Sequence, residues 1–367
     1  MEKEIKILES YYEPLLSGIT VHIGQIIQGL RNENFKFYVL CSTNDNKISK
    51  YYKNLNVPFT IVPKAKYFSF RGMIEIIKFI YKQKIDIVHI HNLQSMFWAN
   101  LPKIFFPKTK FYFTPQVIDF ENKLIEKVFY LVWKIFSILT VKIVVLTDFQ
   151  KIRILRKGIG NEKKLLVIPN SIPDYESTPK IKTEESFHFD SHTKYIVSVI
   201  RLEKQKDPKK IIDIAREIQK KYPDVKFLII GEGDLKKELE TLVTEYNLNH
   251  CVSLLGYRKD AITFIKNSTI ILTTSLWEGL PYTLLEAMYY KKPIVASDIE
   301  GHKSVIIEKQ TGYLANSVTD YVNKISLLLE DENLRNKISS NTYNHFQKNF
   351  SFDKFIEKIK SLYLDLH

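Results

Sequence analysis

Cysteine is scarce in this sequence. Cys41 and Cys251 are the only two cysteines among 367 residues, and they lie far apart with no Cys-x-x-Cys pair. This scarcity excludes a small disulfide scaffold, argues against a structural zinc site and is typical of proteins in a reducing compartment. The first ten residues, MEKEIKILES, mix acidic and basic side chains before a short apolar run, so we expect no signal peptide.

Long uninterrupted apolar segments are also missing. The one candidate for a membrane span, residues 128–146, contains Lys134 and Lys142, and a charge near the centre of a bilayer is costly. The pattern favours an amphipathic helix followed by a buried strand. Apolar residues make up 45% of the chain and charged residues 26%, which is typical of a soluble globular protein, and the length predicts two domains.

Acidic residues are few in one half of the chain. Residues 1–172 hold 26 Lys and Arg against 13 Asp and Glu, whereas residues 173–367 hold 28 of each, so the whole net charge of +13 belongs to the first half. Such a charge attracts an anionic partner, whether nucleic acid, acidic lipid or an anionic small substrate. A genome that favours lysine codons is the alternative explanation, but it does not account for the asymmetry.

Strand patterns alternate with helix patterns along both halves. Apolar runs such as FKFYVLCS flank amphipathic stretches such as GITVHIGQIIQGL, and the alternation restarts at KYIVSVI after residues 173–192, which lack periodicity and are typical of a linker. We expect an α/β protein with two Rossmann-like doubly wound domains, residues 1–172 and 193–367, facing each other across a cleft. The last helix is a candidate for packing back on the first domain. Ligands of such sheets bind at the carboxyl ends of the strands.

The segment SLWEGLPYTLLEAMYYKKP carries the strongest site pattern. Pro281 suits the first position of a helix, whose first amides at Tyr282 and Thr283 then form an anion site. Glu286 lies one turn further on the same face, where its carboxylate can accept two hydrogen bonds from a ribose diol. Glu278, on the preceding loop, can contact the group that the phosphate carries. The alternative is a helix capped by Glu278 with Glu286 in solvent.

A second pattern, VSVIRLEKQKDP, places two cations on one loop after the first strand of the second domain. Arg201, with its planar fork, and Lys206, as a point charge, can together hold a diphosphate. A solvated basic turn is the alternative explanation for such a pair.

Taken together, these patterns resemble the retaining glycosyltransferases of family four, which have the GT-B fold. The resemblance extends over essentially the whole chain. It includes SGITVHIGQIIQGL with Gly18 and His22, DIVHIHN with His91, VIPNSIP with Pro169 and Asn170, LLGYRKD with Gly256, and EGHKSVIIEKQTGYL. Two positions depart from the family pattern. Ser17 stands where a second glycine is usual, and Gln116 stands where relatives often have histidine, so this side chain can position a sugar but cannot titrate.

The resemblance implies transfer of a sugar from a nucleotide donor with retention of anomeric configuration. It implies a catalytic set of Arg201, Lys206, Glu278 and His91. The implied donor-binding residues are Gly18, Gly256, Tyr257, Arg258, Leu280, Tyr282, Thr283 and Glu286, and the implied acceptor-side residues are Gln116 and His22. The diphosphate leaving group develops negative charge, which the cations and the helix N-terminus can stabilise electrostatically. The chain contains no Asp-x-Asp, so we expect neither metal nor other cofactor, and we expect the acceptor hydroxyl to attack on the face that the phosphate leaves.

Other residues are expected to be structural. The glycines of GEGD, residues 231–234, are expected to shape a tight turn rather than hold a phosphate. His89 is expected to point to the opposite face of its strand from His91 and to lie in the core.

For substrates, the resemblance implies a UDP-hexose or UDP-N-acetylhexosamine and a glycan or lipid-linked acceptor in cell-surface polysaccharide synthesis, such as that of lipopolysaccharide or capsule. The alternatives are a nucleotide-sugar 2-epimerase of the same fold and a non-catalytic basic module that binds membrane. No nucleic-acid motif is present, and no nucleic-acid partner is expected.

We expect a cytoplasmic protein held peripherally on the inner face of the membrane by its basic half. Two segments interleave aromatic and basic residues: AKYFSFRG around Lys66 and Arg71, and FWANLPKIFFPKTKFYF around Lys103, Lys108 and Lys110. The alternative is that their aromatic rings pack inside the domain.

Overall fold

The computed structural model describes residues 3–13, 18–43, 45–62, 69–119, 123–175 and 187–364. Ser17 and Lys66 lie outside these ranges, as does most of the predicted linker. The chain divides into two compact units. Unit 1 consists of Met1–Asn170 together with Phe352–His367, and unit 2 consists of Ser171–Ser351.

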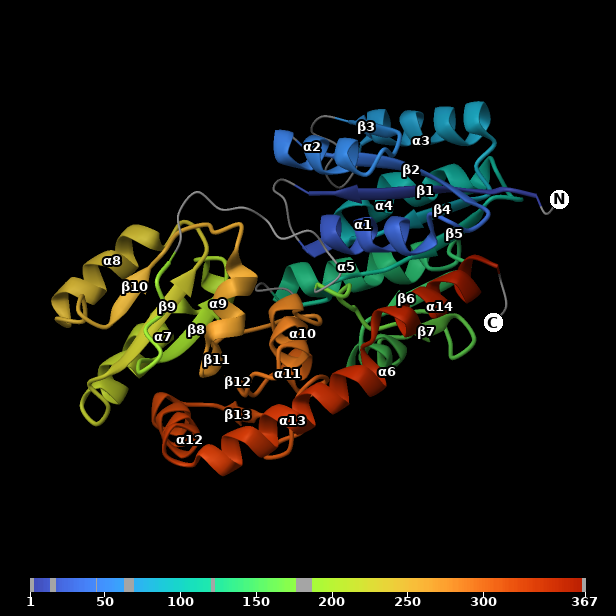
Figure 1. The fold of residues 1–367 in the computed structure, drawn as a ribbon. Helices are drawn as coiled ribbons and strands as arrows, with labels where there is room; N and C mark the ends of the chain where they lie inside the picture. Colours follow the sequence, from blue (N-terminus) through green and yellow to red (C-terminus); the bar gives the residue numbers. More distant parts are fainter. Residues whose placement is uncertain are drawn as a thin grey trace. The chain divides into compact units, whose positions relative to one another are not determined.

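Unit 1 is built on a seven-stranded parallel sheet in the order β3-β2-β1-β4-β5-β6-β7 (Figure 1). Its strands are β1 Ile5–Tyr12, β2 Phe35–Ser42, β3 Phe59–Ile61, β4 Ile87–Ile90, β5 Lys110–Phe113, β6 Lys142–Val145 and β7 Leu165–Val167. Ile7 pairs with Phe37 of β2 on one side and with Ile87 of β4 on the other. The apolar runs are buried on both faces of the sheet, as is typical of a parallel sheet that helices cover on both sides.

The helices of unit 1 cover both faces of that sheet. They are α1 Gly18–Leu30, α2 Asn46–Asn54, α3 Phe70–Gln83, α4 Leu93–Asn100, α5 Lys123–Phe136, α6 Asp148–Arg156 and α14 Phe352–Tyr363, with a short 3-10 helix, η1, over Leu101–Ile104. Ile7 packs with α1, α2 and α14, whereas its neighbour Leu8 packs with α3 to α6. The last helix, α14, thus belongs to unit 1, where it packs on α1 and Phe355 joins the same cluster as Ile7.

Unit 2 is built on a six-stranded parallel sheet in the order β10-β9-β8-β11-β12-β13. Its strands are β8 Lys194–Val199, β9 Val225–Ile230, β10 Val252–Leu254, β11 Ile270–Thr273, β12 Ile294–Ser297 and β13 Tyr313–Ala315. Its helices are α7 Pro208–Gln219, α8 Lys236–Glu245, α9 Ala261–Asn267, α10 Tyr282–Tyr289, α11 Glu300–Lys303, α12 Val318–Glu330 and α13 Glu332–Asn349, with 3-10 helix η2 over Lys204–Lys206. The two doubly wound parallel sheets confirm the predicted α/β fold class.

The apolar stretch 128–146 forms the predicted helix and strand. Helix α5 ends at Phe136, and β6 begins at Lys142. In the part of the chain that the structure describes, no helix combines the length and the apolarity that crossing a bilayer requires.

The GEGD turn and the histidines of β4 were both predicted from local pattern, with different outcomes. Gly231 and Gly233 leave no room for a side chain, because a Cβ at either position would overlap the backbone of Ile200 or Leu202. The GEGD turn is therefore structural, as predicted.

The prediction for His89 was wrong, because residues two apart on a strand share a face, and the rings of His89 and His91 lie 4.1 Å apart. His89 is nevertheless fully buried.

The segment around Lys103 is mostly interior, which favours the alternative for this segment. Its aromatic residues Trp98, Phe111 and Phe113 are buried. The Nζ atom of Lys103 donates to the carbonyl oxygens of Pro107 and Thr109, at 2.8 and 2.7 Å, rather than extending into solvent. Only the tip of this segment, Ile104 and Phe105, exposes large apolar side chains.

Candidate active site

The candidate site of unit 2 lies where β8 and β11 end side by side. These two strands pair at the centre of the sheet, and the strand order runs outward from them in both directions. Such a switch point is the usual ligand site of a doubly wound sheet, because the loops diverge there. The loop after β8 carries Arg201 and Lys206, and the loop after β11 carries Glu278.

Lys206 and Glu278 form an ion pair that joins the two loops. Lys206 Nζ contacts Oε1 of Glu278, and the hydroxyl of Ser275 donates to the same oxygen at 2.8 Å. Burial alone would raise the pKa of Glu278, but the charge of Lys206 and the hydrogen bonds from Lys206 and Ser275 outweigh it and lower the pKa. The carboxylate is therefore ionised at neutral pH. Among the described residues, none donates a hydrogen bond to its Oε2.

The loops that carry this pair are tied together through their backbones. Thr274 Oγ1 donates to the carbonyl oxygens of Lys206 and Asp207, at 2.9 and 2.8 Å. The backbone amide of Leu276 donates to the carbonyl oxygen of Gln205 at 2.8 Å, and Gln205 Nε2 donates to that of Trp277 at 2.9 Å. These contacts hold Lys206 and Glu278 in place before any ligand arrives.

Arg201 does not join the Lys206–Glu278 pair directly. Its exposed guanidinium forms an ion pair with Glu203 at 2.7 Å and donates to Oε1 of Gln205 at 3.2 Å. Gln205 therefore connects Arg201 to the loop of Glu278. Sequence reasoning missed Gln205, because a glutamine on a basic loop has no distinctive pattern.

Helix α10 starts beside the end of β8. Pro281 precedes the helix rather than beginning it, which corrects the predicted position by one residue, and proline offers no side-chain group to cap the helix. The Thr283 hydroxyl donates to the carbonyl oxygen of Val199, the last residue of β8, at 3.1 Å. Since the first amides of a helix have no acceptor within it, the start of α10 is suited to an anion. The side chain of Leu280 is buried, so only its backbone can contact a ligand.

Glu286 accepts a hydrogen bond from a residue far away in the sequence. The hydroxyl of Tyr175 donates to its Oε1 at 3.0 Å. Burial raises the pKa of Glu286 to about 7, although the hydrogen bond from Tyr175 lowers it. The alternative of a solvated Glu286 and a capping Glu278 is therefore wrong for both residues. Tyr175 itself stacks on Tyr290. No pattern in the sequence indicated that Tyr175 belongs to this site.

His302 is a second residue that sequence reasoning missed. It lies buried on α11, where its Nδ1 is 2.9 Å from the carbonyl oxygen of Ser297 and its Nε2 has no hydrogen-bond partner among the described residues. Burial lowers the pKa of His302 to about 4, so the ring is neutral. The preceding residue, Gly301, packs so closely that a Cβ there would lie 2.5 Å from the carbonyl oxygen of Glu278.

The loop after β10 carries the residues predicted to hold the base. Gly256 has a φ of 67°, and its carbonyl oxygen accepts from the amide of Gly231 at 2.8 Å, which joins this loop to the one after β9. The ring of Tyr257 is exposed. Arg258 instead makes a bidentate pair with Asp260, at 2.9 and 2.8 Å, and covers the ring of Phe264.

In unit 1 the predicted histidines lie inside a polar cluster. His91 Nε2 is 2.5 Å from Oε2 of Glu9, whose Oε1 accepts from the hydroxyl of Tyr363 at 2.8 Å. His89 contacts the same hydroxyl at 2.8 Å and Thr114 Oγ1 at 2.7 Å. Burial lowers the pKa of His91 to about 3. Glu9, His89 and His91 are of the types that ligate metals, but their contacts of 2.5–2.8 Å are those of hydrogen bonds.

The other predicted residues of unit 1 differ in exposure. His22 is buried, with its ring 5.5 Å from that of His91, and burial lowers its pKa well below the ordinary value. Gln116 is buried, yet its Nε2 has no hydrogen-bond partner among the described residues. Gly18 is the exposed first residue of α1. Of this group, Gln116 has the geometry of a side chain prepared for a ligand.

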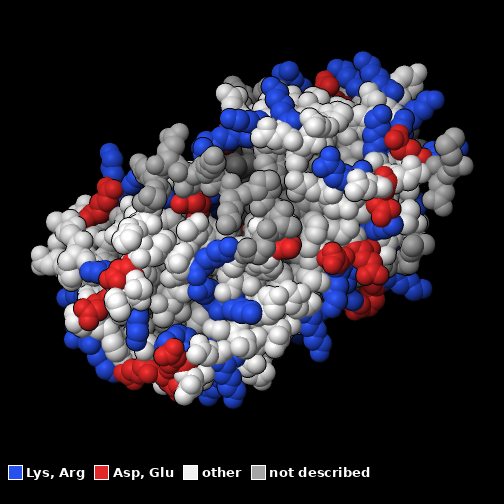
Figure 2. Space-filling model, in the orientation of Figure 1, with Lys and Arg blue, Asp and Glu red and all other residues white. Residues whose placement is uncertain are grey.

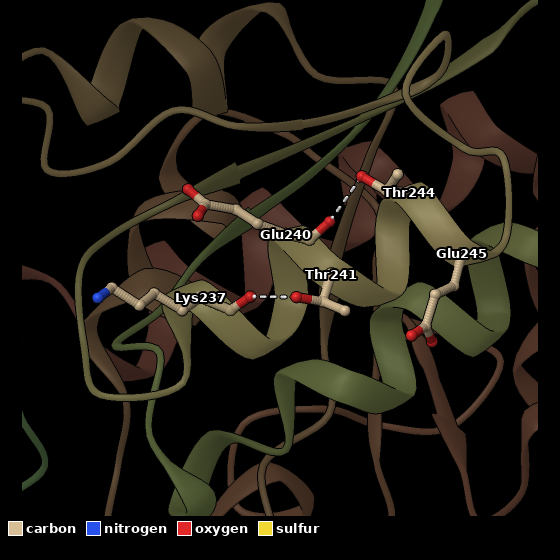
Figure 3. A pocket seen from close by; sticks show the side chains of 5 residues that line it. All are labelled: Lys237, Glu240, Thr241, Thr244 and Glu245. Atoms are coloured by element: carbon tan, nitrogen blue, oxygen red, sulfur yellow. Dashed lines mark hydrogen bonds between the residues drawn. The ribbon is translucent and has the colours of Figure 1, made fainter.

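A surface hollow of about 540 Å³ shares no lining residue with the predicted site (Figure 3). Its lining comes from α8 alone: Lys237, Glu240, Thr241, Thr244 and Glu245. The hydroxyls of Thr241 and Thr244 bond to backbone carbonyl oxygens of their own helix. We assign no function to it.

Two family models together match most of the chain. The family model for Glycosyltransferase Family 4 matches residues 16–174, and that for glycosyl transferases group 1 matches residues 180–345. The UDP-Gal:alpha-D-GlcNAc-diphosphoundecaprenol alpha-1,3-galactosyltransferase of Escherichia coli is 27% identical over 99% of this chain and 97% of its own.

Two solved structures show the same fold. A glycosyltransferase from Rickettsia africae is 20% identical, with a TM-score of 0.82 over 100% of this chain and 99% of its own. Anabaena HepE in complex with UDP-glucose is 16% identical, with a TM-score of 0.79 over 98% of this chain and 99% of its own. The chain therefore belongs to the family-four glycosyltransferases and is a glycosyltransferase of the GT-B fold.

Proposed function

We propose that this enzyme transfers a hexose or N-acetylhexosamine from a UDP donor to a glycan or lipid-linked acceptor, with retention of configuration and without a metal. The observation that carries the proposal is the Lys206–Glu278 pair at the switch point of unit 2, next to the start of α10. The relative from E. coli uses UDP-galactose and a lipid diphosphate acceptor according to its name. That combination fits a role in cell-surface polysaccharide synthesis.

The donor is held through its diphosphate and ribose. Lys206, Arg201 and the first amides of α10 bind the diphosphate, and Glu286 accepts from the ribose hydroxyls. Tyr175 occupies Oε1 of Glu286, and no other described residue donates to the carboxylate, so we assign the ribose contact to Oε2. By the same argument Oε2 of Glu278 accepts from a hydroxyl of the transferred sugar, and the exposed ring of Tyr257 stacks on the base.

The chemical step exchanges two carbon–oxygen bonds at the anomeric carbon. The acceptor oxygen forms a bond to that carbon on the face from which the β-phosphate oxygen departs, and the acceptor proton passes to this phosphate oxygen. Negative charge grows on the departing diphosphate, where Lys206 and the amides of α10 are already oriented, and preorganised donors of this kind lower the barrier. Gln116 positions the acceptor, whereas His91, which is buried against Glu9, supports that side from within the unit.

A donor screen tests this function. The full chain is incubated with UDP- and GDP-linked hexoses and N-acetylhexosamines, and release of nucleoside diphosphate is measured with and without a lipid diphosphate acceptor. We expect release from one UDP-sugar, acceleration by the acceptor, and stabilisation of the protein by the same donor. If no donor released nucleoside diphosphate, the result would favour the non-catalytic module that binds membrane. Inversion at C2 of the donor sugar would favour the nucleotide-sugar 2-epimerase.

We also propose that the enzyme works at the inner face of the cytoplasmic membrane, where a lipid-linked acceptor is presented. The supporting observation is the basic excess of residues 1–172. Figure 2 shows Lys and Arg side chains spread over the visible surface, with groups of Asp and Glu among them. On this face the basic charge is thus distributed, and it acts as a general attraction to anionic lipid.

A further inference from the structure

We propose that helix α5 and the turn after it form the lipid-contact surface, lying in the plane of an anionic membrane among its headgroups. This inference rests on the proposed membrane location. The surface is an aliphatic stripe of five side chains with large exposed fractions: Leu124 70%, Val128 55%, Leu131 62%, Ile135 59% and Ile138 76%.

The spacing of the stripe places its members on one side of the helix. At 100° per residue the four members on α5 fall within an arc of about 60°, and Ile138 lies on the turn that follows. The opposite side of α5 carries Glu126, Tyr130 and Trp133, which are buried against the unit. The stripe is thus a second apolar face that points away from the core. A contiguous exposed apolar face of this kind marks an interaction surface.

The charges around the stripe select an anionic lipid surface as the occupant. Lys127 and Lys134 are exposed and follow one edge of the stripe. The acid on α5, Glu126, is buried and pairs with Arg153 at 3.4 Å. Lysines beside aliphatic residues can extend to lipid phosphates while their stems stay in the apolar layer. A second copy docked antiparallel on the stripe by two-fold symmetry would bring the two lysine edges together, which is unfavourable.

The length of the stripe determines how it meets the bilayer. Residues 124–136 extend about 20 Å as a helix, which is shorter than the ~30 Å hydrocarbon core, and two lysines interrupt them. A helix with this distribution lies in the interface with its apolar face in the acyl boundary. This placement would bring unit 1, which carries Gln116, to the lipid surface.

Vesicle flotation of the full chain tests the surface. The variant Val128→Ser/Leu131→Ser/Ile135→Ser should bind vesicles of phosphatidylcholine with phosphatidylglycerol at least about tenfold more weakly than the wild type, because three exposed aliphatic side chains no longer enter the lipid. The matched control is Ile307→Ser/Leu327→Ser, which removes exposed aliphatic side chains of unit 2 and should bind as the wild type does. Lys127→Gln/Lys134→Gln should lose affinity only for vesicles that contain phosphatidylglycerol.

A local probe and an activity control complete the experiment. A polarity-sensitive fluorophore on Leu131→Cys should shift to the blue with vesicles, whereas one on Leu327→Cys should not. Cys41 and Cys251 are buried, so labelling is selective. All variants should release nucleoside diphosphate from the donor at the wild-type rate, so that loss of membrane binding is separable from failure of the proposed catalysis. Unchanged vesicle binding by the triple variant, no shift of the Leu131 probe, or a dimer that the triple variant dissociates would overturn the proposal.

Discussion

The two units place titratable groups at equivalent points of their sheets, but they use them differently. In unit 1, β1 and β4 bring Glu9, His89 and His91 together, and Tyr363 closes the cluster. In unit 2, the loops beyond β8 and β11 bring Lys206 to Glu278. The first group lies within the strands or directly at their ends, where packing covers it, and the second lies on loops, where a ligand can reach it. The topology of the sheet therefore determines where the polar groups gather. Their distance beyond the strand end determines whether they stabilise the fold or bind a ligand.

This comparison predicts the largest effect for Lys206→Met. Turnover should fall about 100-fold or more, because a preorganised donor to a developing anion is worth roughly 3 kcal/mol. The melting temperature should fall too, since Glu278 then keeps a buried charge without its partner. Lys206→Met/Glu278→Gln removes both charges and should recover the melting temperature but not the turnover. Full activity in either variant would contradict the assignment of Lys206 to the diphosphate.

Tyr363→Phe tests the other side of the comparison. The change leaves Oε1 of Glu9 and Nδ1 of His89 without their partner and should lower the free energy of unfolding by about 2–3 kcal/mol, measured by urea denaturation. Turnover per folded molecule should stay unchanged. Tyr222→Phe, whose hydroxyl donates to the exposed Glu330, is the control and should change stability by less than about 0.5 kcal/mol. A loss of turnover without a loss of stability would place the cluster of unit 1 in the chemistry.

Glu286 predicts a pH dependence of donor affinity. Its pKa is raised to about 7, so the free enzyme holds a proton on it below this pH, and only the ionised form accepts both ribose hydroxyls. Affinity for UDP, measured by calorimetry, should rise about tenfold between pH 6 and pH 8. Glu286→Gln should bind UDP weakly with no such rise. Equal affinity of wild type and variant at pH 8 would remove Glu286 from the ribose site.

The smallest effect is expected at Arg201. Its guanidinium is exposed and already paired with Glu203, so Arg201→Ala should lower turnover by less than about tenfold, and added salt should reduce the difference further. Steady-state kinetics at two salt concentrations measures this. A loss as large as that of Lys206→Met would show that Arg201 moves into the diphosphate site when the donor binds.

Local patterns predicted most of the fold and brought the residues of the candidate site in unit 2 to notice. The alternation of apolar runs indicated both parallel sheets, and the interrupted stretch 128–146 indicated α5 and β6. The residues around Glu278 and Lys206 were identified because each lies on the loop that follows a strand, where a short motif is enough to place a side chain.

Partners that are distant in the sequence could not be predicted in this way. Tyr175 meets Glu286 across 111 positions, and Tyr363 meets Glu9 across 354. Such contacts are set by packing of whole elements, which no local spacing records. The burial of His91 could not be predicted for a related reason. The sequence around a histidine at a strand end is the same whether the side chain packs under a helix or contacts a ligand.

Tyr363 has a consequence for how the chain folds as it is made. Unit 1 is assembled from the beginning of the chain and its last helix, α14, so its core stays incomplete during synthesis until the helix with Tyr363 has left the ribosome. Unit 2 consists of one continuous segment and can fold earlier. The apolar surface of α1, where α14 packs, is exposed during that interval and is a point at which nascent chains are open to aggregation or to chaperones. Loss of α14 by a premature stop would therefore impair the folding of unit 1, most of which is made first. Unit 2, which directly precedes the stop in the sequence, would be affected less.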